Sequence, residues 1–570
     1  MSSNKQNGTL RWIISTTKRE LKYVGIMILS HSAISILALW AATSYESLVD
    51  SAVDGNLAAF RSAAVFLISL IVLQVLTSAF TRQLREYSKA AVENRLKERL
   101  FSRILSKDYA SVAAVHSGEW MNRLSSDTAT VADGVAQIVP EVVGLTVRLV
   151  GALYLLFVLI PAFVWMLVPG SILVGLITYY FRRKLKDLYK VIRDKDGLLR
   201  IFLQEHISSL MIVHSFNREE KTLELADGRM AAHKKARMKR ATFSNMSQTS
   251  FAVVMNGIYV ASAVYCGYLI ITGKMSYGTF TAVLQIVTQI RSPFQNITGY
   301  MPKYYAMLAS AERLMEIESY QDDLKGERIP ENDVLDFYRN HFQALQLKNI
   351  NFTYRKPDAE HSDMTVPQVL KDVNVLINKR EYVALTGPSG CGKSTILKIL
   401  MCLYPIDSGE KLIIGTEGEQ ELTSGWRALY AYVPQGNQLM SGTIREIITF
   451  NSKDADESGI WEALRISCAE DFVRDLPEGL NTRLGEGGAG LSEGQMQRIA
   501  IARAVYSDHP ILLLDESTSS LDEKTELEVL ARIRNMTDKT VIIVTHRPAA
   551  LDICDKRIQF SAENVTVRSI

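Results

Sequence analysis

Six long apolar stretches crowd into the first 310 residues and constrain the fold more than any other feature of this 570-residue chain. A helix that crosses a bilayer needs about 20 consecutive, mostly apolar residues. Six stretches approach or exceed that length: Tyr23–Tyr45, Ala58–Phe80, Ile138–Leu159, Phe163–Phe181, Phe251–Ile271 and Thr279–Met301. One such stretch alone could be a buried helix of a large soluble core. Six of them in succession predict a membrane domain.

Lysine and arginine are distributed unequally among the connections, and this predicts the orientation of the chain. The connection at 82–107 carries eight of these cations, and 182–240 is equally basic. The connection after Tyr45 has no cation before Arg61, and the last connection has only Lys274. Because basic connections stay on the cytoplasmic side, we expect a multi-pass protein of the plasma membrane whose two termini and soluble second half are cytoplasmic.

The basic connections have the composition of helices rather than of loops. A continuous helix from Ala58 to Ser106 would be ~74 Å long at 1.5 Å per residue, whereas the hydrocarbon layer is only ~30 Å thick. The helices should therefore project into the cytoplasm and reverse at two tips, near Ala113–Gly118 and Glu205–His214. Such tips could contact a cytoplasmic partner, and a solvated hairpin without a partner is the alternative.

Polar side chains follow one face of the last apolar stretch, from Thr281 to Gly299. Polar groups at membrane depth are stable when they face protein or water, so the stripe predicts a helix that lines a polar cavity. Packing between helices is the alternative explanation, as are structural pairing or snorkelling for the two arginines. The candidate substrate-cavity residues are Gln285, Gln289, Arg291, Asn296 and Arg148.

The last 230 residues have the mixed composition of a soluble domain. The whole chain is 47% hydrophobic and has a net charge of +3. These values exclude a disordered chain and give no reason to expect nucleic acid as a partner. None of the five cysteines forms a CxxC pair, so neither a zinc site nor a redox pair is indicated.

A glycine-rich loop follows the strand-like run Glu381–Thr386. It runs from Gly387 to Thr395 with the spacing GxxxxGK[ST], and a helical pattern comes directly after it. Glycines allow backbone N–H groups to surround phosphates, and the helix N-terminus adds positive potential. We expect Lys393 to reach the β- and γ-phosphates and the Ser394 hydroxyl to ligate Mg²⁺.

Two further apolar runs end in polar residues, as parallel strands at one sheet edge would. Ile511–Leu514 is followed by Asp515 and Glu516, and Val541–Val544 leads to His546. We expect Asp515 to hold Mg²⁺ and Glu516 to orient and polarise the attacking water.

In identity and order, these motifs resemble those of the ATP-binding cassette (ABC) transporters. The resemblance covers residues 345–560 and extends to Gln435 as the Q-loop, Leu491–Gln495 as the signature, Ser519–Asp522 as the D-loop, and His546 as the H-loop. It implies that Tyr354 stacks on adenine and that Glu516 and His546 are catalytic. The implied ATP-binding residues are Tyr354, Gly387, Ser389, Gly390, Cys391, Gly392, Lys393, Ser394, Thr395, Gln435, Ser492, Gly494, Gln495 and Asp522; the implied Mg²⁺ ligands are Ser394, Gln435 and Asp515.

Six spans ahead of one cassette resemble a half-transporter of the exporter type, with the type IV fold. This implies an α-helical membrane domain of six long transmembrane helices at 1–320, a linker at 321–344, and a cytoplasmic α/β P-loop ATPase domain at 345–570. It also implies that the two cytoplasmic tips, near Ala113–Gly118 and Glu205–His214, are coupling helices. In the family two cassettes pair head to tail, so the expected partner is a second copy of the same chain, with a heterodimer as the alternative. One departure is Glu493, which stands where the family signature has glycine, and we expect it to change the rate modestly.

The function predicted from the sequence is ATP-driven export of a small molecule, lipid or peptide by alternating access. ATP and Mg²⁺ are the cofactors, and membrane lipid and an unidentified substrate are further partners. Import on the same fold, for example of siderophores, is the nearest alternative. A soluble cassette ATPase acting on nucleic acid or ribosomes is disfavoured by the six spans, and an ATP-gated channel by the absence of a degenerate nucleotide motif.

Overall fold

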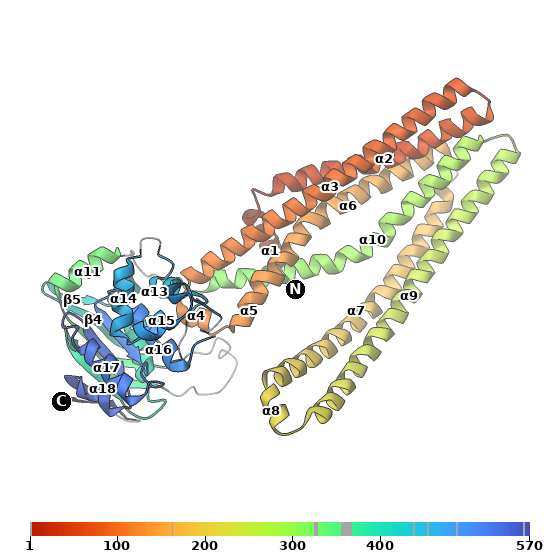
Figure 1. Cartoon of the computed structure of the whole chain (residues 1–570). Coiled ribbons are helices and arrows are strands. Elements are labelled where there is room, and N and C mark those ends of the chain that lie inside the picture. Colours follow the sequence, from red (N-terminus) through yellow and green to blue (C-terminus); the bar gives the residue numbers. More distant parts are fainter. Residues whose placement is uncertain are drawn as a thin grey trace. The chain divides into compact units, whose positions relative to one another are not determined.

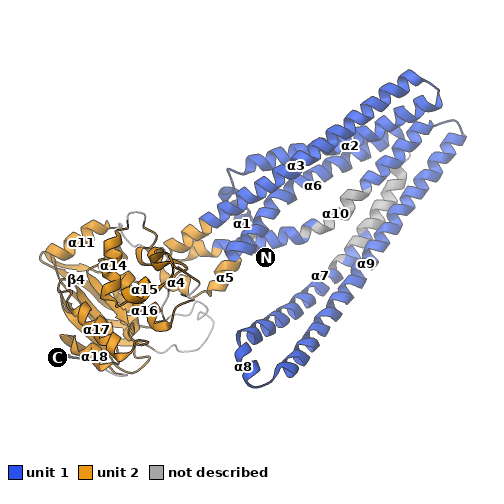
Figure 2. Cartoon of the chain, in the orientation of Figure 1, with its two compact units in different colours: residues 1–98, 123–315 blue, residues 99–122, 316–570 orange. Residues whose placement is uncertain are grey.

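The computed structural model describes residues 3–161, 164–323, 329–354, 368–436, 439–452, 455–485, 488, 490–561 and 565–569. Side chains are described for these residues except 3–6, part of 164–186, 291–299, 301 and 565–569. The described chain divides into two compact units, residues 1–98 with 123–315 and residues 99–122 with 316–570 (Figure 2).

Among the described residues, six long helices dominate the first unit (Figure 1). They are α2 (Leu21–Val53), α3 (Leu57–Ser106), α6 (Thr128–Leu159), α7 (Val164–Ser208), α9 (Glu219–Ile271) and α10 (Tyr277–Glu316), and a short helix α1 (Ser3–Thr16) precedes them. Each overlaps one of the six predicted apolar stretches, and Phe163, where the fourth stretch begins, lies outside the described residues. Within the described residues, four segments are long and apolar enough to cross a membrane: α2, α3, the segment ending in α6, and α9.

The long helical extensions predicted from the sequence are present as continuous helix. Helix α3 has 50 residues and α9 has 53, well beyond the roughly 20 that a bilayer requires. The chain reverses through α4 (Tyr109–Ala113), α5 (Ser117–Asn122) and a single π-turn at Arg123–Asp127 on one side, and through α8 (Leu210–Ser215) on the other. Both reversals lie where the sequence predicted the tips.

Small residues bring α2 and α6 close together. The hydroxyl of Ser35 donates to the carbonyl of Gly144 at 2.8 Å. A Cβ added at Gly144 would lie 2.8 Å from the Cβ of His31, and one at Gly151 would lie 2.4 Å from Leu39 Cδ1. Lipid gives apolar helices no hydrophobic reason to associate, so this close approach of backbones stabilises the pair.

A carboxylate of α2 caps the start of α10. Asp50 accepts hydrogen bonds from the Gly278 amide and the Ser276 hydroxyl, both at 2.7 Å, and Glu46 accepts one from the Thr279 hydroxyl at 2.7 Å. The first turn of a helix has unpaired N–H groups and a positive dipole end, which the anions satisfy. Residue 278 must be glycine here, because an added Cβ would lie 2.2 Å from the carbonyl oxygen of Glu46.

A polar cluster centred on Glu141 joins four helices. The Glu141 carboxylate is paired with Arg85 of α3 at 2.8 Å, accepts from Gln137 one turn before it, and accepts from the hydroxyl of Tyr300 of α10. Arg85 also contacts His31 Nε2 of α2 at 3.1 Å. Charges shielded from water are stable when they are paired inside the protein, so the cluster ties α2, α3, α6 and α10 together.

The second unit is built on a mostly parallel six-stranded sheet, with strand order β12-β11-β3-β10-β9-β6. Its strands are β3 (Tyr382–Thr386), β6 (Tyr430–Val433), β9 (Ile511–Asp515), β10 (Thr540–Val544), β11 (Lys556–Phe560) and β12 (Val565–Ser569). A second, antiparallel sheet has the order β2-β1-β4-β5, from β1 (Phe342–Phe352), β2 (Leu370–Asn378), β4 (Ser408–Gly415) and β5 (Gly418–Glu421). A short ladder pairs β7 (Gly442–Thr443) with β8 (Arg483–Leu484).

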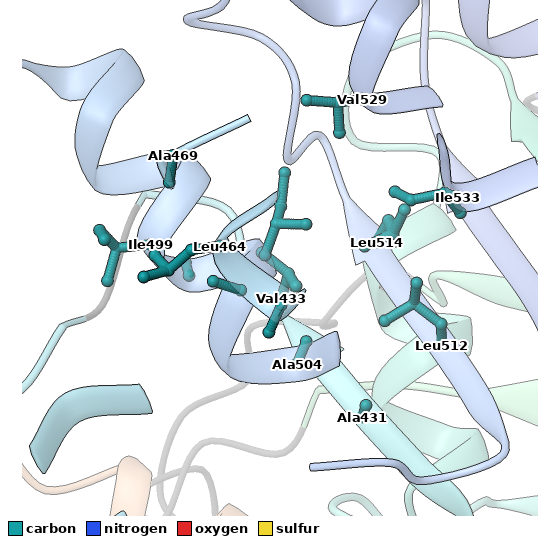
Figure 3. Packing of buried hydrophobic residues seen from close by; sticks show 14 of the residues in the cluster. Ala431, Val433, Leu464, Ala469, Ile499, Ala504, Leu512, Leu514, Val529 and Ile533 are labelled. Atoms are coloured by element: carbon teal, nitrogen blue, oxygen red, sulfur yellow. The ribbon is translucent and has the colours of Figure 1, made fainter. Parts of the chain in front are cut away.

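Helices cover the parallel sheet on its faces, as buried parallel strands require. They are α12 (Lys393–Leu400), α13 (Ile444–Thr449), α14 (Glu457–Ile466), α15 (Glu470–Asp475), α16 (Glu493–Tyr506), α17 (Glu523–Arg534) and α18 (Pro548–Asp552). One core places Val433 of β6 and Leu512 and Leu514 of β9 with Leu464 of α14 and Ile499 of α16 (Figure 3).

The segment 321–344, which the sequence analysis assigned to a linker, contains helix α11 (Glu331–Asn340). Val334 and Tyr338 of this helix are buried in the second core of the unit, and the Tyr338 hydroxyl is 2.8 Å from the Thr540 hydroxyl. The helix is amphipathic and packs against the antiparallel sheet, so this part of the segment belongs to the folded unit. Four of its ten residues are charged and only two are buried, so its sequence gives a weak signal for a packed helix.

Candidate nucleotide site

The carboxyl ends of four adjacent parallel strands gather the site residues at one edge of the sheet. Val544 of β10 lies opposite Leu385 of β3 and Asp515 of β9, and Val433 of β6 lies opposite Leu514. The residues that follow these strands are therefore neighbours in space. Ligands of open α/β sheets bind at this edge.

The glycine-rich loop between β3 and α12 has the backbone that its sequence predicts. Gly387, Gly390 and Gly392 have φ values of +142°, +81° and +97°, which glycine adopts at low cost. A Cβ at Gly387 would lie 2.3 Å from the Phe560 carbonyl oxygen. Lys393 donates to the carbonyl oxygens of Gly387 and Pro388, both at 2.8 Å, so its ammonium group is held inside the loop.

The remaining loop residues differ in their exposure. Ser389 and Gly390 form the exposed tip of the loop, Cys391 is half-buried, and Thr395 is buried in the first turn of α12. The first backbone N–H groups of a helix are free to bind an anion, and the helix dipole favours one there.

Asp515 sits at the end of β9 with both carboxylate oxygens in contact with hydroxyl groups. The Ser394 hydroxyl donates to Oδ1 at 2.8 Å, and the Tyr432 hydroxyl donates to Oδ2 at 3.3 Å. Burial raises the pKa of Asp515 above its ordinary value, against the effect of these two hydrogen bonds. A buried carboxylate beside a serine hydroxyl is a donor set suited to a hard cation such as Mg²⁺.

Glu516 lies between the Q-loop and the H-loop residues. The amide of Gln435 donates to Oε2 at 2.7 Å, and Nε2 of His546 is 3.7 Å from Oε1. Glu516 has a φ of +49°, a left-handed conformation that is uncommon for a non-glycine residue and that often marks functional positions. In this arrangement Gln435 occupies one oxygen of the carboxylate and leaves the other facing the histidine.

Tyr354 follows β1 and lies beside the loop. Its hydroxyl is 2.9 Å from the hydroxyl of Thr395, so the side chain contacts helix α12, which follows the glycine-rich loop. Its neighbours are Phe352 and Tyr404, at ring-centroid distances of 4.8 and 5.3 Å.

The signature residues form the start of α16. Ser492 accepts from the Gln495 amide at 3.3 Å, and the Gln495 side chain accepts from the Ser492 amide at 2.9 Å, which is a capping box. Glu493 is the first residue of the helix, where an anion is favourable. Gly494 approaches the D-loop so closely that a Cβ would lie 2.9 Å from the Ser520 carbonyl oxygen.

Asp522 caps α17 by accepting from the Thr525 amide at 3.0 Å.

The structure also reveals positioning residues that the sequence analysis missed. The buried amide of Gln497 donates to Ser519 and accepts from the Ser520 amide, each at 3.0 Å. It thereby joins the signature helix to the D-loop. Its position two residues after the signature is the signal that could have found it.

A second missed residue is Arg547, directly after the H-loop histidine. It pairs with buried Glu526 of α17 at 2.8 Å and donates to the carbonyl oxygens of Ser519 and Leu521. The guanidinium group therefore connects the D-loop with the end of β10. Its many N–H donors make arginine suited to hold a loop in this way.

The candidate substrate-cavity residues of the membrane unit do not form a cluster like that of the sheet edge among the described side chains. Gln289 donates to the Ala38 carbonyl oxygen of α2 at 2.9 Å, which is a contact between helices. Gln285 is half-buried on the same helix, and Arg148 is half-buried on α6, where its Nε has no hydrogen-bond partner among the described atoms. The side chains of Arg291 and Asn296 lie outside the described residues.

Two family profiles match the chain in succession. The profile described as ABC transporter transmembrane region matches residues 23–294, and the profile described as ABC transporter matches residues 370–519. The chain belongs to the ABC transporter family. This ABC transporter carries its membrane and ATP-binding regions in one chain and hydrolyses ATP to drive transport.

Curated relatives cover most of the chain. It is 27% identical over 497 residues to a multidrug resistance ABC transporter ATP-binding and permease protein of Lactococcus lactis, covering 87% of this chain and 80% of the relative. It is 28% identical over 471 residues to an ATP-dependent lipid A-core flippase of Syntrophus aciditrophicus, covering 81% and 74%. It is 27% identical over 551 residues to a putative export ATP-binding/permease protein of Rickettsia felis, covering 94% and 91%.

The fold is similar to that of a solved structure, a bacterial Atm1-family ABC exporter with ATP bound. The TM-score is 0.79 at 21% sequence identity, and the likeness covers 97% of this chain and 95% of the other. The predicted architecture, a bundle of long membrane helices with an α/β ATPase domain, is confirmed.

Proposed function

We propose that this ABC transporter is an exporter that works as a homodimer with two competent ATP sites. One observation carries the proposal: the sheet edge brings Ser394, Asp515, Gln435, Glu516 and His546 together in direct or near contact. Each of these positions holds a residue able to perform its role. Two identical chains would therefore suffice for two working sites.

The relatives support export as the direction. Their names describe multidrug resistance, lipid A-core flipping and export. Import on the same fold, the alternative left open by the sequence, gains no support from them. The transported molecule is a small molecule, lipid or peptide.

The geometry supports a division of labour among the site residues. Glu516 orients and polarises water at the γ-phosphate, because it is the carboxylate with an oxygen facing His546 rather than a scaffold hydroxyl. Gln435 contacts the other oxygen, so movement of the Q-loop alters the group that acts on water. His546 positions Glu516 and the phosphate, and Tyr354 stacks on adenine.

Mg²⁺ would be held by Ser394 and Asp515, whose contact already brings a hydroxyl and a carboxylate oxygen within 2.8 Å. Gln435 is the third proposed ligand. When bound, the ion would neutralise charge on the phosphates. Lys393 would exchange its two loop carbonyls for phosphate oxygens.

The second reversal of the membrane unit supports pairing with another copy. Five large apolar side chains there are exposed within one chain, with Met211 at 83% and Phe216 at 73%. The others are Ile207, Leu210 and Ile212. Exposed apolar side chains that are concentrated in one short segment are typical of an interaction surface, and a second cassette would cover them.

Transport direction can be measured in proteoliposomes whose ATPase domains face outward. We expect ATP to drive accumulation of a fluorescent dye cation or a short-chain fluorescent lipid inside the vesicles, and Glu516→Gln vesicles to accumulate neither. ATP-driven loss of a preloaded probe would instead show import.

The proposed location is the plasma membrane, with both termini and the ATPase domain cytoplasmic. Single cysteines in place of exposed Asp54 and Lys274 should react with an impermeant thiol reagent applied to intact cells, and one in place of exposed Ser208 should not. Native Cys266 is buried, which keeps labelling of the unchanged protein low. Labelling at Ser208 would overturn the orientation.

A further inference from the structure

The H-loop histidine is only loosely held by its own side chain. The His546 side chain is 49% exposed, and its Nε2 lies 3.7 Å from Glu516 Oε1. A contact of that length between partly exposed groups contributes little to holding a side chain in place. The geometry of the pair therefore depends on the residues that precede and follow the histidine.

The residue before His546 continues the end of β10. Thr545 is buried, and its amide donates to the carbonyl oxygen of Leu385 in β3 at 3.2 Å. The Thr545 hydroxyl accepts from the amide of Arg547 at 3.0 Å. The backbone thus turns at the histidine, and Arg547 is the N-terminal cap residue of α18.

The residue after His546 reaches a carboxylate that the reaction does not use. Arg547 pairs with Glu526 Oε2 of α17 at 2.8 Å, and the side chain of Glu526 is 3% exposed. The second oxygen of Glu526 accepts from the Thr518 hydroxyl at 2.7 Å. Both oxygens are therefore bonded inside the protein. Such a pair resists displacement, because separating it leaves an uncompensated charge in the interior.

We propose that Arg547 is a positioning residue for ATP hydrolysis, which holds His546 beside Glu516 by tying the H-loop to buried Glu526. This inference rests on the roles proposed above for Glu516 and His546. The exposed histidine obtains a fixed position from the anchored arginine that follows it. Displacement of a group at the reaction centre by about 1 Å can lower the rate about 10²-fold, so a firm anchor matters for turnover.

Arg547 could also act by another route, because it donates to the D-loop carbonyl oxygens of Ser519 and Leu521, at 2.5 and 3.0 Å. The two routes differ in whether they need the histidine. If Arg547 acts through His546, its loss has little further effect once the imidazole is absent. If it acts through the D-loop, the two losses multiply, as they do for independent sites.

The test is a double-mutant cycle on the full-length protein in lipid nanodiscs. Steady-state kcat and KM for ATP are measured for the parent, Arg547→Gln, His546→Ala and the double variant. We expect Arg547→Gln to lower kcat at least about tenfold, because the misplaced histidine acts on the chemical step. Its KM should stay within about twofold of the parent, because binding in the ground state is unchanged. In the His546→Ala background, Arg547→Gln should lower kcat by less than about twofold.

Two further variants separate the anchor from general destabilisation. Glu526→Gln removes the buried anion and leaves the D-loop carbonyl oxygens in place, so it should lower kcat by a factor similar to that of Arg547→Gln. Arg534→Gln is the matched control, because it breaks the 2.6 Å ion pair with Asp555 at the other end of α17. Its kcat should stay within about twofold of the parent. Melting temperatures are measured on the same preparations, and Arg547→Lys, which keeps the cation, replaces Arg547→Gln in the cycle if that variant does not fold.

A double variant whose loss of kcat equals the product of the two single losses overturns the inference and leaves the role of His546 intact. Equal losses of kcat in Arg534→Gln and Arg547→Gln also overturn it, because both would then reflect instability of α17. His546→Ala with turnover near that of the parent contradicts the proposed role of the H-loop itself, and the inference falls with it.

Discussion

Two glutamates show how differently the two halves of this transporter use a carboxylate. Glu141, in the membrane unit, is 14% exposed at its side chain and is bonded to Arg85, Gln137 and Tyr300. Glu516, at the sheet edge, is 28% exposed, with one oxygen bonded to Gln435 and the other 3.7 Å from His546. Neighbouring side chains therefore satisfy the carboxylate of Glu141, whereas the carboxylate of Glu516 has an oxygen that can still accept a hydrogen bond from a ligand.

This difference indicates which carboxylates stabilise the fold and which take part in the reaction. A carboxylate with every partner supplied by neighbouring helices stabilises the fold, because breaking it leaves an unpaired charge. A carboxylate held at a strand end in a strained conformation has its position fixed by the backbone. Substitutions of the first kind should change stability, and substitutions of the second kind should change turnover.

The largest expected effect is at the proposed metal ligand. Asp515→Asn should lower ATP turnover about 100-fold, because the neutral amide binds Mg²⁺ poorly, while leaving thermal stability nearly unchanged. Tyr432→Phe is the matched control. It removes the hydrogen bond from the Tyr432 hydroxyl to Asp515, at 3.3 Å, and should lower ATP turnover less than threefold. Steady-state ATPase rates with Mg²⁺ titration measure both. Equal losses in the two variants would mean that Asp515 acts through packing.

The next effect is on stability in the membrane unit. Glu141→Gln leaves Arg85 without its anionic partner and should destabilise the bundle by about 1–3 kcal/mol, since the pair is largely shielded from water. The control is Glu93→Gln, which breaks the more exposed pair with Lys97 on α3 and should cost less than about 0.5 kcal/mol. Thermal unfolding in detergent gives the order of the two. If Glu141→Gln were as stable as the parent but had a slower basal ATPase rate, Glu141 would serve turnover rather than stability, and the contrast with Glu516 would be wrong.

A smaller effect separates two glutamines of the α10 stripe. The Gln289 side chain donates a hydrogen bond to α2. Its loss in Gln289→Leu should lower the free energy of unfolding by about 0.5–1.5 kcal/mol and leave stimulation of the ATPase by transported compounds intact. Gln285→Leu should do the opposite if the stripe lines the substrate path. Melting temperature and stimulated ATPase are measured on the same preparations. If both variants lose only stability, the stripe serves helix packing alone.

The smallest expected effect is at the departure from the family signature. Glu493→Gly removes an anion near the proposed phosphate position and should lower the KM for ATP two- to threefold, an effect of the size expected for a solvent-exposed charge. Glu493→Gln removes the charge without adding a glycine and should give a similar KM. A KM that rises in both variants would show that the carboxylate assists the site.

The sequence could predict which residues meet at the proposed nucleotide site because local spacing places them. Gly387 to Thr395 form one contiguous loop, and Asp515, Glu516 and His546 each follow a buried strand, so parallel topology alone brings them to one edge. The contact between Gln435 and Glu516 joins residues 81 positions apart, and only the fold could reveal it. The same holds for Gln497 and Arg547, which bond to the D-loop.

The membrane half was predicted in outline and not in detail. Apolar length located the six long helices of the described residues, and the helix-like composition of the basic connections predicted their extensions. Hydropathy cannot say which helix a polar group faces, so Gln289 was expected in a cavity although it contacts the Ala38 carbonyl oxygen. Helix α11 was missed because it has only two buried positions, Val334 and Tyr338, among charged residues, so its apolar pattern is short.

The most direct test of the account is to count the nucleotide trapped by Glu516→Gln. The variant should hydrolyse ATP at least 100-fold more slowly than the parent, since a general base contributes about 10²–10⁴-fold. Incubated with ATP and Mg²⁺ and passed through a desalting column, it should retain two ATP molecules per dimer of identical chains. Turnover near that of the parent, or no retained nucleotide, would contradict the assignment of Glu516 and the paired sites together.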